Sequence, residues 1–203
     1  MYGAYWHWAR FGGKYQELEN QYRSRQAFTK TEWQTYQDIS LIKLLSTCVH
    51  DVPYYRENWS ASQKEAALAG SLSDLPILEK EPLRSSAGQF KDSSRHPFPG
   101  FTFYTSGTSG TPIASLFTLS ELRSSLALRE VRSANWAGVS FSLPRATFSG
   151  RLVEPDPAKD QHVYRYNASE KQVYFSAFHL KPTTAKFYIE ALMKHKVEWM
   201  TGY

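Results

Sequence analysis

A change of sequence pattern across residues 85–100 constrains the fold more than any other feature of this chain. This stretch has the Gly, Pro and Ser content that is typical of a loop, with Pro97 and Pro99 near its end. Before it, apolar residues recur at helical spacing; after it come short runs of aromatic and β-branched residues. We therefore expect a helical N-terminal front over residues 1–95 and an α/β region over residues 96–203, both as parts of one larger domain.

Helices dominate the expected front. Residues 14–28 are polar and helix-compatible, and a longer helix is predicted over residues 32–50 from its apolar spacing. Thr31 offers this longer helix an N-terminal cap, and Pro53 ends it because the residue before a proline disfavours helical backbone angles.

The second region alternates strand-like and helix-like segments. Thr118 and Glu121 have the spacing of a capping box, which predicts the start of a helix. We expect strands at residues 101–105, 113–117, 145–148, 173–178 and 197–200, and helices from 118 towards 136 and from 182 through 195. This order favours an α/β class. Because the chain stops just after the last expected strand, we expect a truncated domain.

Composition limits the classes of function. A chain of 203 residues can bury a core without disulfides, and the single cysteine, Cys48, fits a reducing compartment. The apolar stretch around residues 41–49 is too short to span a membrane, so we expect a cytoplasmic, soluble protein. The net charge of +5 is compatible with anionic ligands from nucleotides to nucleic acid, and it does not choose between them because the cations are spread along the chain. Nucleic-acid binding is the weaker hypothesis, and we expect no nucleic-acid partner. Scattered histidines and one cysteine predict no metal site of the zinc type.

The segment most informative about chemistry is residues 104–112, Tyr-Thr-Ser-Gly-Thr-Ser-Gly-Thr-Pro. Two glycines three positions apart allow tight turns and the close approach of backbone N–H groups to an anion. Hydroxyl side chains add donors without fixed charge. The segment lacks the Gly-Lys-Ser/Thr ending of a Walker A loop. We expect it to bind phosphate groups through Thr105, Ser106, Gly107, Thr108, Ser109, Gly110 and Thr111; the alternative is a plain polar turn between two strands.

This segment resembles the phosphate-binding signature of the AMP-forming adenylating enzymes, the acyl-CoA and aryl-CoA ligase superfamily. Residues 52–56 and 75–81 resemble the phenylacetate–CoA ligase-like branch, which includes capsular-polysaccharide-biosynthesis proteins. The resemblance implies the N-terminal portion of an acid–thiol ligase. Such an enzyme joins a small carboxylic acid to ATP, giving an acyl-adenylate and pyrophosphate with Mg²⁺, and then passes the acyl group to coenzyme A.

The sequence also departs from this family. Many relatives carry Lys directly after the loop proline, where this chain has Ile113. The family's acidic magnesium-binding segment, ribose-binding Asp and catalytic Lys are expected beyond residue 203, so no catalytic residue is assigned and this portion is expected to be inactive alone. The alternative is a non-catalytic truncated relative, acting as a binding or structural protein linked to polysaccharide biosynthesis.

Two further residues are candidates for substrate binding. Arg151 can bind a carboxylate or phosphate through its planar guanidinium group; the alternative is a surface ion pair with Glu154 or Asp156. His179, at the end of an aromatic strand, can line an acyl pocket, as aromatic or His residues do in the family. Its alternative is a hydrogen-bonded histidine at a strand end.

Overall fold

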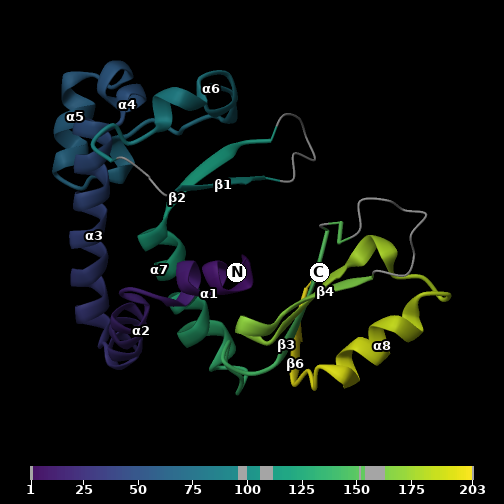
Figure 1. Cartoon of the computed structure of the whole chain (residues 1–203). Helices are drawn as coiled ribbons and strands as arrows, with labels where there is room; N and C mark the ends of the chain where they lie inside the picture. Colours follow the sequence, from purple (N-terminus) through teal and green to yellow (C-terminus); the bar gives the residue numbers. More distant parts are fainter. Residues whose placement is uncertain (1, 96–99, 106–111, 151, 154–162, 203) are drawn as a thin grey trace. The chain divides into compact units, whose positions relative to one another are not determined.

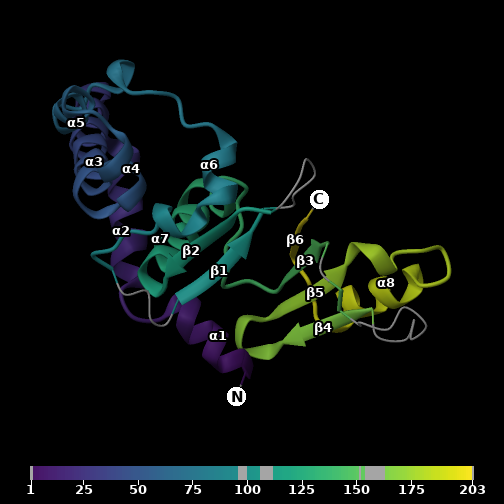
Figure 2. The ribbon, with the colours of Figure 1, turned by 90° about the horizontal axis from the view of Figure 1, so that it is seen from above.

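The computed structural model describes residues 2–95, 100–105, 112–150, 152–153 and 163–202. The chain forms two compact units, one made of residues 24–122 and the other of residues 1–23 together with 123–203. This division differs from the boundary expected at residues 95 and 96. Figures 1 and 2 label the helices and strands of both units.

The unit of residues 24–122 begins with three packed helices. They are α3 (Lys30–Asp51), α4 (Pro53–Asn58) and α5 (Ala61–Leu68), and they lie side by side in Figures 1 and 2. Leu45, Val49, Trp59 and Ala67 form their buried core, whereas Ile39, Ile42 and Leu44 of α3 are exposed.

The prediction of Thr31 as the cap of the long helix is wrong. The N-cap is Thr29, whose hydroxyl oxygen accepts from the N–H of Glu32 (3.3 Å), while the Glu32 carboxylate accepts from the N–H of Thr29 (2.7 Å). Glu32 stands three residues after Thr29, and this reciprocal pair satisfies two N–H groups that have no partner within the helix. Pro53 ends α3 as expected, but it also begins α4, because proline suits the first position of a helix.

The expected loop of residues 85–100 contains more structure than its composition indicates. The 3₁₀ turn η2 (Leu72–Asp74) is followed by a short helix, α6 (Lys80–Ser85), and then by the 3₁₀ turn η3 (Ala87–Phe90). Phe90 anchors η3, because its ring stacks on that of Tyr54 with centroids 4.2 Å apart.

The expected hairpin is confirmed. Strand β1 (Gly100–Tyr104) pairs antiparallel with β2 (Ala114–Thr118), in a register that places Phe101 opposite Phe117. Helix α7 (Leu119–Arg129) follows directly, with the predicted capping box between Thr118 and Glu121. It continues as a π-helical turn, η4 (Glu130–Ala134).

The other unit is built on a four-stranded sheet with the order β4-β5-β3-β6. Strand β3 runs parallel to both β5 and β6, and β4 runs antiparallel to β5. The strands are β4 (Tyr164–Asn167), β5 (Gln172–Ser176), β3 (Arg145–Ser149) and β6 (Trp199–Thr201), and helix α8 (Ala185–Lys194) connects β5 to β6.

The core of this unit lies between α8 and the sheet. Phe175 is fully buried, and its ring stacks against those of Phe148 and Tyr188, at centroid distances of 4.8 and 4.7 Å. The other buried residues of the cluster are Ala146, Val163, Val173 and Ala191. Strands β5 and β6, which precede and follow α8 in the chain, both run parallel to β3. This strand–helix–strand order is compatible with an α/β class. Two short turns, η5 (Ala168–Glu170) and η6 (Ala177–His179), flank β5.

The first residues of the chain belong to this same unit. Helix α1 (Tyr2–Phe11), which the sequence did not predict, is joined to η5 by an ion pair from Arg10 to Glu170, and α2 (Tyr15–Ser24) follows it. Within the described ranges, no helix combines the length and apolar character that a membrane span requires.

Candidate functional site

The predicted phosphate-binding segment connects β1 to β2. Ser106, Gly107, Thr108, Ser109, Gly110 and Thr111 lie outside the described residues. Thr105 is described and exposed, just after β1. Its N–H donates to the carbonyl of Ile113 (3.1 Å), and the N–H of Ile113 donates to the Thr105 hydroxyl oxygen (3.0 Å). The two ends of the segment are therefore tied together, while the hydroxyl proton of Thr105 remains to be donated elsewhere.

The two predicted substrate-binding residues differ in what the structure describes. Arg151 lies outside the described residues. His179 lies in η6, one short turn beyond the end of β5, rather than in the strand itself. Its side chain is buried, and its Nε2 atom has no hydrogen-bond partner among the described residues. His179 belongs to the unit with the four-stranded sheet and Thr105 to the other unit.

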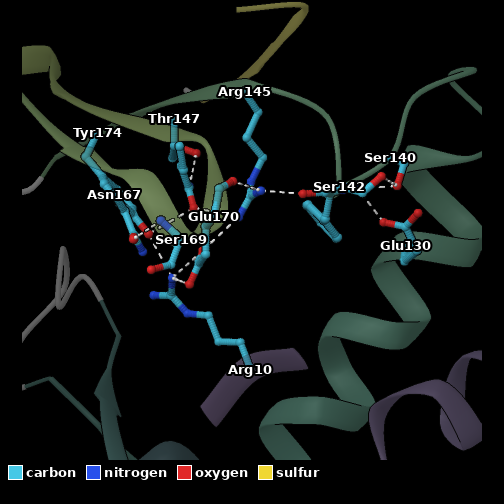
Figure 3. Close-up of polar contacts among 12 residues, drawn as sticks. Arg10, Glu130, Ser140, Ser142, Arg145, Thr147, Asn167, Ser169, Glu170 and Tyr174 are labelled. Atoms are coloured by element: carbon cyan, nitrogen blue, oxygen red, sulfur yellow. Dashed lines mark hydrogen bonds and ion pairs between the residues drawn. The ribbon is translucent and has the colours of Figure 1, made fainter. Parts of the chain in front are cut away.

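A buried ionic network links α1 to the sheet. Two arginines converge on Glu170: Arg10 Nη1 lies 3.0 and 2.9 Å from its two carboxylate oxygens, and Arg145 Nη2 lies 2.8 Å from Oε2. Figure 3 shows these side chains approaching Glu170 from opposite sides. Arg145 also donates to the Glu170 carbonyl and to Gln172 Oε1, at 2.8 and 2.7 Å. Every polar atom of this carboxylate is thus matched by donors, as a buried charge requires.

The two arginines differ in their surroundings. Burial lowers the pKa of Arg145, and the attraction of Glu170 only partly opposes this effect. Burial also lowers the pKa of Arg10, but Tyr174 and Glu170 together outweigh it, so the pKa of Arg10 lies above its ordinary value. Both side chains remain cations at neutral pH.

A cavity of about 540 Å³ opens beside this network. The aromatic residues Phe11, Tyr15 and Phe141 line it, together with Glu130, Glu170 and several other polar residues. Phe11 packs edge-on against Tyr15 with ring centroids 5.1 Å apart, and lies 6.3 Å from Phe141. The volume is within the range of sites that bind small molecules.

Glu130 is the first residue of the π-helical turn and is only 4% exposed. Its Oε1 accepts from Asn135 Nδ2 and its Oε2 accepts from the N–H of Phe141, both at 2.8 Å. Figure 3 shows Glu130 on its helix, apart from Glu170 and the two arginines. Burial raises the pKa of Tyr15, and the negative charges of Glu130 and Glu19 raise it further.

Sequence reasoning did not identify the residues of this cavity or of the ionic network beside it. Arg10, Glu130, Arg145 and Glu170 occur far apart in the chain, in no recognisable spacing. Each is a common residue type in a polar context, so no local signal distinguishes it from a solvated surface charge. The π-helical turn that buries Glu130 has no sequence signature of its own.

Comparison with known proteins gives one partial similarity. Part of the chain is 23% identical over 133 residues to Protein CapK of Staphylococcus aureus. The similar region covers 66% of this chain and 29% of that protein. No protein-family model matches the sequence, and no solved structure matches it. The chain is therefore distantly similar to part of a longer protein.

Proposed function

We propose that this chain is part of an AMP-forming acid–thiol ligase of the phenylacetate–CoA ligase-like branch. The observation that carries the proposal is the Ser/Thr/Gly segment of residues 105–111 between two paired strands, where Thr105 and Ile113 are hydrogen-bonded to each other. The partial similarity to Protein CapK supports the proposal, because the sequence resembles the branch that includes capsular-polysaccharide-biosynthesis proteins.

In this proposal the segment binds the phosphates of ATP through backbone N–H groups and hydroxyls. Thr105 contributes its hydroxyl proton, and Gly107 and Gly110 allow the backbone to approach the phosphate oxygens. Bound Mg²⁺ would neutralise part of the phosphate charge. Because Ile113 stands where many relatives carry Lys, most of the binding rests on neutral donors.

His179 is proposed to line the site of the carboxylic acid. A buried imidazole nitrogen without a partner can accept from, or donate to, a polar group of a bound molecule. Arg151 is proposed to attract the carboxylate by its charge. Since ATP and coenzyme A are cytoplasmic substrates, the proposal also places the protein in the cytoplasm.

Nucleotide binding tests the proposal directly. We expect ATP with Mg²⁺ to bind the chain in isothermal titration calorimetry, and Gly107→Val or Gly110→Val to weaken binding at least about tenfold by obstructing the backbone. Gly88→Val is the matched control, since a Cβ at Gly88 meets no atom within 4 Å and the backbone there needs no glycine. Equal affinities for all four proteins would contradict the proposal.

The reaction is tested in the complete gene product. Labelled pyrophosphate should exchange into ATP only when a suitable carboxylic acid is present, and an acid panel that includes aryl acids should reveal the substrate class. A second candidate function, that of a non-catalytic binding protein, is favoured by Ile113 in place of the usual Lys. Nucleotide binding without exchange for any acid would support that second function over the ligase.

A further inference from the structure

One end of the cavity lies where α1 meets η5, and the proposed ligase reaction does not use it. His7 lines this end from α1, and Ser169, Glu170 and Lys171 line it from η5 and the residue after it. Figure 3 shows Arg10 reaching from its helix toward Ser169 and Glu170. All residues that line the cavity belong to the unit with the four-stranded sheet, so its geometry is set within that unit.

Positive charge is in excess at this end of the cavity. Arg10 and Arg145 share the carboxylate of Glu170, and Lys171 adds a third cation. Arg10 makes its hydrogen bonds to Glu170 and Tyr174 through Nη1 alone, which leaves its Nε and Nη2 atoms without a hydrogen-bond partner among the described residues. Three cations beside one carboxylate give a positive potential, which favours an anionic ligand.

Lys171 has a backbone conformation that is unusual for its residue type. Its φ angle is +49°, in the left-handed region that favours glycine. Two hydrogen bonds hold the backbone there, from the Lys171 N–H to the carbonyl of Ala168 (3.3 Å) and from the Arg145 N–H to the carbonyl of Lys171 (3.0 Å). The ammonium group forms no ion pair with any described residue, and the side chain is exposed beside the cavity. Strained residues are concentrated at ligand sites, so a lysine at this position indicates a role for its charge.

The other carboxylates of the lining are already engaged. Glu19 lies 2.6 Å from Arg23. Both oxygens of Glu130 accept hydrogen bonds at 2.8 Å, one from a side-chain amide and one from the N–H of Phe141. Figure 3 shows Glu130 on its own helix, apart from the network around Glu170. An anion at the α1–η5 end therefore meets the excess of cations and not these carboxylates.

The rest of the lining favours a polar ligand. Arg129 and Arg145 lie over the ring of Phe141, 5.5 and 5.4 Å from its centroid, so this ring offers little surface to an apolar molecule. Amide and hydroxyl groups that can both donate and accept hydrogen bonds come from Gln16, Ser140 and Ser142. The hydroxyl groups of a ligand also donate and accept, so they match this lining.

We propose that this cavity binds a small hydroxylated organic phosphate, whose phosphate group contacts Lys171, Ser169 and His7 while its hydroxyl groups face the polar lining. A phosphate group has three strong acceptor oxygens, which suits donors that come from two elements. Lysine binds phosphate as a point charge, and the hydroxyl of Ser169 adds a neutral donor. The volume of the cavity leaves room for an organic body beside the phosphate group. The proposal stands independently of the ligase reaction.

Glycerol 3-phosphate, glycerol and inorganic phosphate are the probes for the test. Titration of the ¹⁵N-labelled chain in a phosphate-free buffer at fixed ionic strength gives the affinity and the location together. We expect glycerol 3-phosphate to shift the amide signals of Ser169 and Lys171 and to bind at least about tenfold more tightly than glycerol, as charged hydrogen bonds imply. Inorganic phosphate should shift the same signals but bind more weakly, because it lacks the hydroxylated body.

Lys171→Gly tests the role of the ammonium group, and Lys196→Gly is the matched control. Lys196 has a φ angle of +50° in the same unit and is not among the residues that line the cavity. Both substitutions remove one positive charge and suit the backbone, so both variants should fold. We expect Lys171→Gly to weaken the binding of glycerol 3-phosphate at least about tenfold and Lys196→Gly to leave it unchanged.

Four results would overturn the proposal. The first is equal affinity of the two variants for glycerol 3-phosphate. The second is glycerol or inorganic phosphate binding to the unaltered chain as tightly as glycerol 3-phosphate does. The third is a set of shifted signals that lies away from Ser169 and Lys171, and the fourth is no binding of any probe.

Discussion

Replacement of Glu170 by Gln should strongly destabilise the unit with the four-stranded sheet. The Glu170 side chain is fully buried, and it joins two arginines whose side chains are 4% exposed (Arg145) and 24% exposed (Arg10). The amide introduced by Glu170→Gln would still accept from one arginine, but its NH₂ group would face the other. Arg145 would then remain a buried cation without a counter-charge.

The expected loss follows from burial. Removing one partner of a buried ion pair costs roughly 3–5 kcal/mol, whereas the more exposed Arg10 contact contributes about 1 kcal/mol or less. We therefore expect the free energy of unfolding to fall by about 4 kcal/mol. For a chain of this size each kcal/mol lowers Tm by roughly 2–4 °C, so Tm should fall by about 10 °C.

Urea and thermal unfolding, followed by circular dichroism, measure this effect. Glu57→Gln is the control, because its partner Arg56 lies 4.0 Å away and both side chains are about half exposed. That substitution should change the free energy of unfolding by less than about 1 kcal/mol. In addition, Glu170→Leu and Arg145→Met should be coupled in a double-mutant cycle by roughly 1–3 kcal/mol. A loss for Glu170→Gln no larger than that for Glu57→Gln would refute the reasoning.

Two other predictions concern a helix cap and a histidine. Thr29→Ala should lower the free energy of unfolding by about 1 kcal/mol in urea titrations, since it removes the N-cap of α3. Thr31→Ala should have little effect. A larger loss for Thr31→Ala than for Thr29→Ala would show that Thr31 is the cap. Burial, aided by Lys194, lowers the pKa of His195, so the folded state binds fewer protons there than the unfolded state. The contribution of neutral His195 to the free energy of unfolding is therefore complete above about pH 6.5, the ordinary pKa of histidine. It is lost as the pH falls towards the lower pKa that His195 has in the folded state. Accordingly, His195→Gln should reduce the loss of Tm on acidification, and the exposed control His50→Gln should not; identical pH profiles for both variants would contradict this assignment.

Local signals in the sequence determined much of the secondary structure. The capping box of Thr118 and Glu121, the paired strands on either side of residues 106–111, and the long helix α3 all depend on residues close together in the chain. Capping and turn formation need only neighbours, so a sequence pattern is sufficient to predict them. The error at Thr31 was also local, because Glu32 follows Thr29 by three residues and Gln34 follows Thr31 by three, so both threonines have the spacing of a capping box.

Tertiary structure alone decided which segments meet. Arg10 and Glu170 are 160 residues apart, and their ion pair draws α1 into the unit of the C-terminal sheet rather than into the helical front. The cavity likewise needs Phe11 and Tyr15 from the start of the chain beside Glu130 and Phe141 from its middle. Such contacts arise because burial of apolar surface and pairing of charges act through space, independently of separation along the chain. A sequence pattern records only the spacing within one element, so it cannot contain this information.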